Sequence, residues 1–453
     1  MSERTMFSEL RVRTRQIAES EVFGKVLSIG GLELEVAGLG AAARMGGHVK
    51  VADRIRGEIV AVDRDVATVL PFGTWEGVAL ADDVRLIDAG GDIYPDESWL
   101  GRVLDAFGQP LDDALLCEGP HCYPPRAVPP EAFQRRSTGK KLETRIKAID
   151  AFTPICRGQR LGVFAGSGVG KSTLMAMLAR QIDADVIVIG LVGERGREVQ
   201  DFISRDLGPE GMARSVLVVA TSDQPPLTRR QAAWTATAIA EFLRDQGQHV
   251  LLMIDSVTRF AMAQREIGLA AGEPPTSRGY TPTVFAELPR LLERSGPGRN
   301  VPGQGDITAI YTVLVDGDDH NEPIADTVRG ILDGHIILDR KIAEGGRYPA
   351  IDIAKSVSRA LPHCHAPAER AIMTSARRAL ALNAEMEDLV RIGAYRAGGD
   401  ARTDAAIQFA SLADGFLCQA SSDSLSADET FATLYGLLDE AGLPLSPEEL
   451  AAG

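Results

Sequence analysis

A run of glycine and hydroxyl residues follows a short apolar segment that ends at Ala165. The segment Arg160–Ala165 is predicted to be a buried strand, and a helical pattern begins with Leu174 and Met175. In such a strand–loop–helix unit, glycines let successive amide hydrogens point at phosphate oxygens near the positive end of the helix. The sequence therefore predicts a nucleotide-binding loop rather than an ordinary glycine-rich turn. Its phosphate-binding residues are predicted to be Gly166, Ser167, Gly168, Val169, Gly170, Lys171, Ser172 and Thr173.

Two side chains of this loop have separate predicted roles. Lys171 can reach the β and γ phosphates of ATP, and the Ser172 hydroxyl can ligate Mg²⁺. The usual pattern of such a loop begins with glycine, whereas this chain has Ala165 at that place. Because the other glycine turns lie inside the loop, we expect phosphate binding to be retained.

Two carboxylates follow later apolar segments of the same kind. The predicted strand Val186–Val192 is followed closely by Glu194, and the predicted strand Val250–Ile254 by Asp255. Ligands of parallel sheets bind at the carboxyl ends of the strands, where a carboxylate can orient or deprotonate a water molecule. Glu194 is therefore the candidate for that role, and Asp255 the candidate for holding Mg²⁺ through water. The alternatives are a solvated carboxylate at a helix start for Glu194 and a helix cap for Asp255.

The elements around these residues alternate between strands and helices from about residue 140 to 345. Such alternation predicts an α/β domain with a parallel sheet covered by helices. Before it, alternating segments with glycine-rich turns predict a small β-barrel. After it, Ala, Leu, Glu and Arg dominate and predict a helical domain. The predicted division is an N-terminal docking segment at 1–21, a β-barrel at 22–92, the nucleotide-binding domain at 93–360 and the helical domain at 361–453.

The overall composition is that of a globular protein of several domains. The chain has 453 residues, of which 45% are hydrophobic and 25% charged. Its formal charge of −15 disfavours broad capture of nucleic acid. Residues 361–453 contain 6 Arg against 14 Asp and Glu, so the helical domain is expected to present acidic surface to its partners.

The five cysteines are scattered and indicate neither a disulfide framework nor a zinc site. No apolar run has the roughly 20 residues that a membrane span needs, and the N-terminus lacks the apolar core of a signal peptide. These features favour a cytoplasmic protein.

Long collinear stretches resemble the RecA-like hexameric ATPases related to the catalytic subunit of rotary ATP synthase. The resemblance is stronger to the flagellar protein-export ATPases and their type III secretion relatives, and it covers nearly the whole chain. The segment Glu385–Tyr395 resembles the export branch, since the acidic lever motif of the ATP synthase subunit is absent there. The most specific stretches are Arg157–Arg160, Gly193–Val199, Asp255–Glu266, Asp306–Asp326 and Ile331–Ile336.

The resemblance implies further site residues. Tyr348 would pack beside adenine, and Arg359 would be an arginine finger that stabilises the transferring phosphoryl group in a neighbouring subunit. Arg195 would sense the phosphate beside the catalytic Glu194. The alternatives are a core tyrosine for Tyr348 and a structural ion pair for Arg359. Phe416 either closes the adenine pocket or belongs to the core.

The same resemblance implies a homohexamer that hydrolyses ATP with Mg²⁺ and energises export of flagellar proteins. The implied partners are a stator-like regulatory subunit, a coiled-coil central stalk, export-gate membrane proteins and chaperone–substrate complexes, with no nucleic acid. The implied location is the cytoplasmic face of the inner membrane. Three alternatives remain open: a virulence (injectisome) secretion ATPase, an RNA-translocating hexamer and a noncatalytic nucleotide-binding scaffold. The segments Gly346–Ile351 and Lys355–Arg359 favour the flagellar branch.

Overall fold

The computed structural model describes residues 21–87, 91–112, 114–315, 317, 319 and 322–452. These residues form two compact units, each built from several segments of the chain. Of the described residues, the first unit contains those up to 135 together with 185–203 and 209–307, and the second contains 136–184, 204–208 and those from 308 onward. The predicted docking segment lies outside the described residues except for residue 21.

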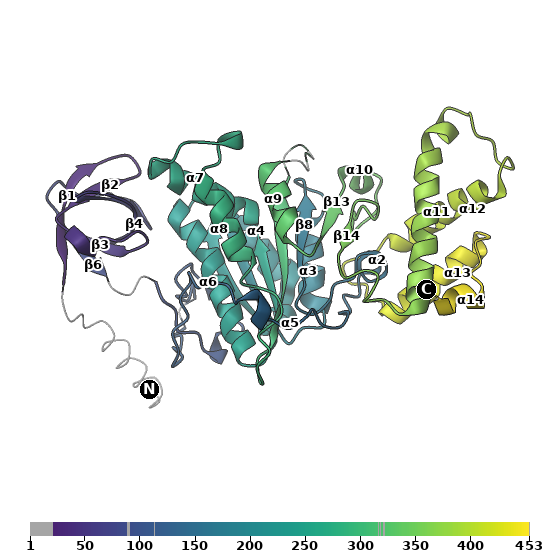
Figure 1. Cartoon of the computed structure of the whole chain (residues 1–453), viewed down its shortest axis with the longest axis horizontal. Coiled ribbons are helices and arrows are strands. Elements are labelled where there is room, and N and C mark those ends of the chain that lie inside the picture. Colours follow the sequence, from purple (N-terminus) through teal and green to yellow (C-terminus); the bar gives the residue numbers. More distant parts are fainter. Residues whose placement is uncertain are drawn as a thin grey trace. The chain divides into compact units, whose positions relative to one another are not determined.

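The first unit begins with a closed barrel of six antiparallel strands (Figure 1). Alternate side chains point into its core, where Leu34, Val49 and Val69 are fully buried. The predicted β-barrel is therefore confirmed. Its strands, in the order β1-β2-β5-β4-β3-β6, are β1 Phe23–Ile29, β2 Leu34–Ala37, β5 Val66–Pro71, β4 Ile55–Asp63, β3 His48–Val51 and β6 Asp83–Ile87.

The rest of the first unit contains parallel strands in the order β11-β9-β10-β7. Helix α6 (Pro226–Asp245) packs along β9, β10 and β11, and it contacts α7 and α8 (Figure 1). Gly190 of β9 permits this packing, because a Cβ there would lie 3.1 Å from the Ala236 Cβ of α6. The other elements are β7 Val103–Leu104, β9 Val186–Glu194, α4 Gly196–Asp201, α5 Gly208–Ala213, β10 Ser215–Thr221, β11 His249–Asp255, α7 Val257–Ala270 and α8 Pro282–Leu292.

The second unit contains strands in the order β14-β13-β8-β12, of which β13, β8 and β12 are parallel and β14 is antiparallel. Together with the parallel strands of the first unit, they confirm the predicted α/β fold. Their continuous apolar sequences follow from burial on both faces. The elements are α2 Lys147–Phe152, β8 Arg160–Ala165, α3 Lys171–Gln181, β12 Asp306–Leu314, α9 Pro323–Ile331, β13 Gly334–Leu338, α10 Arg340–Glu344 and β14 Val357–Ser358.

The second unit ends in four helices, and the predicted helical end of the chain is confirmed (Figure 1). Ser426 and Glu429 form a capping box at the start of α13, which satisfies amide groups of its first turn. Within the described ranges, no helix combines the length and apolarity required to cross a membrane. The helices are α11 Pro367–Arg391, α12 Ala401–Leu417, α13 Ala427–Glu440 and α14 Pro447–Ala452.

A buried histidine of the barrel makes stability sensitive to acid. Burial lowers the pKa of His48 from 6.5 to about 4, opposed by Glu58 and helped by Arg56, Arg230 and Arg126. The unfolded chain therefore binds a proton between these pH values while the folded chain does not, so stability is lost as pH falls from 6.5 to 4. When the pH is lowered from 6.5 to 4, the unfolding free energy of the parent should fall by about 3 kcal/mol more than that of His48→Gln, measured by urea titration. The exposed His121→Gln should follow the parent, and equal losses in all three proteins would contradict the assignment.

Candidate functional site

The predicted phosphate loop occupies the turn between β8 and α3. Gly168 and Gly170 have φ angles of +79° and +92°, a region that glycine adopts without steric cost. Ala165 is buried and is the last residue of β8, so the departure from the usual pattern falls in a strand rather than in the turn. The loop therefore has the backbone freedom that close approach to phosphate requires.

The side chains of the loop are arranged for an anionic ligand. Lys171 is the first residue of α3, and Ser172 and Thr173 are exposed in its first turn. Val169 is buried and anchors the loop to the core. The amide groups at the start of a helix attract negative charge, and a lysine and hydroxyls at that end add a cation and polar ligands.

Tyr348 lies beside the phosphate loop in the same unit. A Cβ added at Gly170 would lie 3.4 Å from the Tyr348 ring. The Tyr348 residue is 44% exposed, so the alternative of a core tyrosine is wrong. The backbone amide of Gln419, in the loop after α12, donates to the Tyr348 carbonyl at 2.7 Å. Phe416 is half-buried, and the Lys147 Nζ lies 5.1 Å from the centre of its ring.

Arg359 lies at the opposite end of the strands from the phosphate loop of its own unit. Its amide donates to the carbonyl of Asp333, which precedes β13, whereas Leu338 at the other end of β13 pairs with Ala165. Asp333 and Leu338 are five residues apart along the strand, which corresponds to roughly 16 Å. The Arg359 side chain is exposed and has no ion pair with the described part of the chain. The geometry thus contradicts the structural ion pair and leaves the guanidinium available to another molecule.

Glu194 and Asp255 end neighbouring parallel strands of the first unit. Glu194 is the last residue of β9 and is half-buried, and its carbonyl accepts the amide hydrogen of Ser222. Asp255 is the last residue of β11 and pairs in register with Leu191 of β9. Both carboxylates thus lie at the carboxyl edge of these strands, as expected. The helix-cap alternative for Asp255 is wrong, because the cap of α7 is Ser256, which accepts from the Arg259 amide at 3.3 Å. Glu194 ends its strand two residues before the start of α4, and its catalytic role stays a prediction.

The Arg195 side chain is exposed, and its guanidinium contacts Glu198 at 3.4 Å. Arg340 of α10 is a further site residue, not predicted from the sequence, and it donates to the Ser167 carbonyl of the phosphate loop at 3.2 Å. Gln419, which holds the backbone at Tyr348, was likewise not predicted. The signal for Arg340 is its place directly after β13, because Asp339 caps α10 at the carboxyl end of that parallel strand.

Two family models match the chain in succession. The ATP synthase alpha/beta family, nucleotide-binding domain, matches residues 145–358. The T3SS EscN ATPase C-terminal domain matches residues 366–435. The first match contains the phosphate loop, Glu194 and Asp255, and the second begins just before α11.

Relatives match over nearly their whole length. The flagellum-specific ATP synthase of Caulobacter vibrioides is 50% identical over 425 residues, which cover 92% of this chain and 96% of the relative. The type 3 secretion system ATPase of Xanthomonas euvesicatoria is 46% identical over 437 residues, with coverage of 94% and 96%. The solved structure of the assembled ATPase EscN from enteropathogenic E. coli matches with a TM-score of 0.86 and 40% identity, over 92% of this chain and 100% of that chain. The chain therefore belongs to the family of flagellar and type III secretion ATPases, whose nucleotide-binding domain is that of the ATP synthase alpha and beta subunits.

Proposed function

We propose that this ATPase hydrolyses ATP to ADP and phosphate in order to energise export of flagellar proteins through a type III export apparatus. The observation that carries the proposal is the phosphate loop at the start of α3, with the exposed ring of Tyr348 beside it in the same unit. The loop suits the phosphates, and the ring offers a surface on which adenine can stack. ATP is thus the substrate that fits both features.

Phosphoryl transfer requires charge stabilisation at the phosphates and a positioned water molecule. Lys171 and the loop amides bind the β and γ phosphates, and the Ser172 hydroxyl and the Asp255 carboxylate hold Mg²⁺. These oxygen ligands suit Mg²⁺, which would neutralise negative charge on the phosphates when bound. Asp255 would hold the ion through water.

Glu194 orients the attacking water and accepts its proton, a role that suits a half-buried carboxylate at a strand end. Arg359 acts on the site of a neighbouring copy, since it lies away from the phosphate loop of its own unit. Arg195 senses the phosphate from its exposed position after Glu194. The nucleotide sites are therefore completed at the interfaces of a homohexameric ring.

The proposed stalk partner is supported by a solved relative, and the other proposed partners rest on the family resemblance alone. One solved relative is the assembled EscN in complex with its central stalk EscO. For this chain we infer a coiled-coil central stalk, a stator-like regulatory subunit, export-gate membrane proteins and chaperone–substrate complexes, at the cytoplasmic face of the inner membrane. The acidic helical domain supplies charge for such contacts.

The flagellar branch is preferred to the injectisome branch. The identity to the flagellar protein of Caulobacter vibrioides supports this preference, at 50% against 46% for the secretion ATPase of Xanthomonas euvesicatoria. Deleting the gene should abolish flagellar filaments seen by electron microscopy. Normal filaments in the deletion strain would overturn the flagellar assignment while leaving the ATPase chemistry in place.

The purified chain should hydrolyse ATP only with Mg²⁺ present. Chelation with EDTA should lower phosphate release by at least about 100-fold, because the phosphate charge is then no longer neutralised. Added Mg²⁺ should restore the rate, measured by a coupled phosphate assay. The same assay with single-stranded RNA serves as a control, and stimulation that falls with salt would favour the RNA-translocating alternative.

A further inference from the structure

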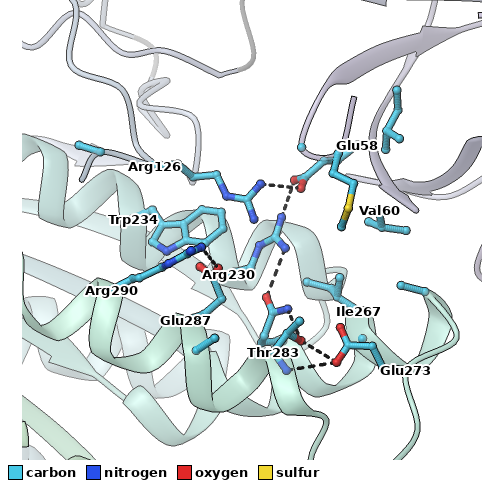
Figure 2. A pocket seen from close by; sticks show the side chains of 18 of the residues that line it. Glu58, Val60, Arg126, Arg230, Trp234, Ile267, Glu273, Thr283, Glu287 and Arg290 are labelled. Carbon is cyan, nitrogen blue, oxygen red and sulfur yellow. Dashed lines mark hydrogen bonds and ion pairs between the residues drawn. The ribbon is translucent and has the colours of Figure 1, made fainter. Parts of the chain in front are cut away.

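A cavity of about 720 Å³ lies within the first unit, between the barrel and helices α6, α7 and α8 (Figure 2). Its walls come from β4, from residues 126–129 and from the three helices. None of the residues proposed to bind nucleotide lines it. A cavity of this size is typical of small-molecule sites.

One carboxylate in the cavity wall is shared by two guanidinium groups. Glu58 of β4 accepts from Arg230 of α6 and, at 3.1 Å, from Arg126. The Glu58 and Arg230 side chains are both nearly completely buried. Because one negative charge faces two positive charges in a buried place, this end of the cavity has an excess positive charge.

The other charged groups of the cavity have partners of their own. Arg290 pairs with Glu287 at 2.9 Å, and the buried Arg294 pairs with Glu241 at 2.6 Å. The remaining carboxylate, Glu273, accepts two hydrogen bonds from Thr283. Figure 2 shows Glu273 and Arg126 on opposite sides of the cavity. Glu287 also interacts electrostatically with Arg230, so the excess positive charge lies mainly at Arg126.

The Arg126 guanidinium is held in place, and some of its N–H groups have no acceptor among the described residues. Its guanidinium lies 4.2 Å from the centre of the Trp234 ring, a cation–π contact that restrains it. Gly46 leaves room for it, because a Cβ there would lie 2.6 Å from its Nη1. Within the described residues, its side chain donates only to Glu58, although 42% of the side chain is exposed. A stacked guanidinium with a free edge is suited to bidentate binding of carboxylate or phosphate.

We propose that this cavity binds a small organic anion, with its carboxylate or phosphate head on Arg126 and a short apolar body along Val60 and Ile267. Both apolar side chains line the cavity and are buried in one hydrophobic cluster. The ligand would connect the barrel strand β4 to α7, the helix that begins two residues after Asp255. The site is separate from nucleotide binding and does not depend on the proposed function.

The test is calorimetric titration of the full chain with hexanoate, hexyl phosphate and hexylamine, with the nucleotide site saturated by MgADP. Both anions should bind, and the tighter of the two identifies the head group. Arg126→Gln should weaken the binding of the anions by about tenfold or more, since a charge-assisted hydrogen bond is lost. Arg126→Lys, which keeps the charge next to Glu58 but lacks the planar edge, should bind more weakly than the parent. The exposed Arg391→Gln should bind like the parent.

Three results would overturn the proposal. The first is hexylamine binding as tightly as the anions, and the second is unchanged anion affinity in both Arg126 variants. The third is absence of anion binding to the parent chain. If Arg126→Gln then also loses ring assembly, measured by light scattering, the cavity is assigned to an acidic side chain of another copy. If Arg126→Gln does not fold, Arg126→Lys decides alone.

Discussion

Glu194→Gln is expected to bind ATP nearly as well as the parent while kcat falls by about 10²- to 10⁴-fold. The amide is nearly isosteric with the carboxylate, so the end of β9 and its pairing with β10 should persist. An amide has no basicity for accepting a proton from the attacking water. The loss should therefore lie in kcat rather than in KM, measured by steady-state phosphate release together with ATP binding by calorimetry.

Glu210→Gln is the matched control, because Glu210 is an exposed carboxylate of the same unit, in α5. Its kcat should stay within about twofold of the parent, as expected for a surface charge. An unchanged kcat in Glu194→Gln would show that Glu194 has no catalytic role. If the parent itself hydrolyses no ATP, the noncatalytic scaffold becomes the better description.

The elements that carry these residues were predictable because their signals are local. The continuous apolar runs ending at Ala165 and Ile254 mark strands buried on both faces, and the structure has β8 and β11 there. Two of the glycines after Ala165, Gly168 and Gly170, have positive φ angles, which suits the tight turn expected there. Strand ends are also local, so Glu194 and Asp255 could be placed at the edge of a parallel sheet without knowing its strand order.

The positions of Arg359 and Arg126 could not be predicted in the same way, since they depend on contacts far apart in the chain. The antiparallel pairing of β14 with β13 decides at which end of the strands Arg359 lies. Likewise, the ion pair between Glu58 and Arg230 joins residues of a barrel strand and a helix that have no sequence pattern in common. Such pairings follow from tertiary packing rather than from periodicity or propensity.

Mixing Lys171→Ala and Arg359→Ala proteins should restore activity that neither has alone. Lys171→Ala removes the cation at the phosphates, and Arg359→Ala removes a finger worth about 10³ to 10⁵ in rate, so each pure ring should be nearly inactive. In an equal mixture, about one quarter of the interfaces in a ring would join an intact loop to an intact finger. The mixture should therefore recover up to about a quarter of the parental rate, measured after joint assembly.

The matched control is a mixture of Lys171→Ala with Glu194→Gln. We assign both residues to the site of the same chain, so every site in that mixture has one lesion and no activity should return. Recovery in the first mixture but not in the second would establish that Arg359 acts between copies. Recovery in neither, in rings proven mixed by mass spectrometry, would contradict the finger, because the exposed guanidinium would then have no site to complete. The two mixtures can tell action within a chain from action between copies, because Arg359 lies by Asp333, at the opposite end of the strands from its own phosphate loop.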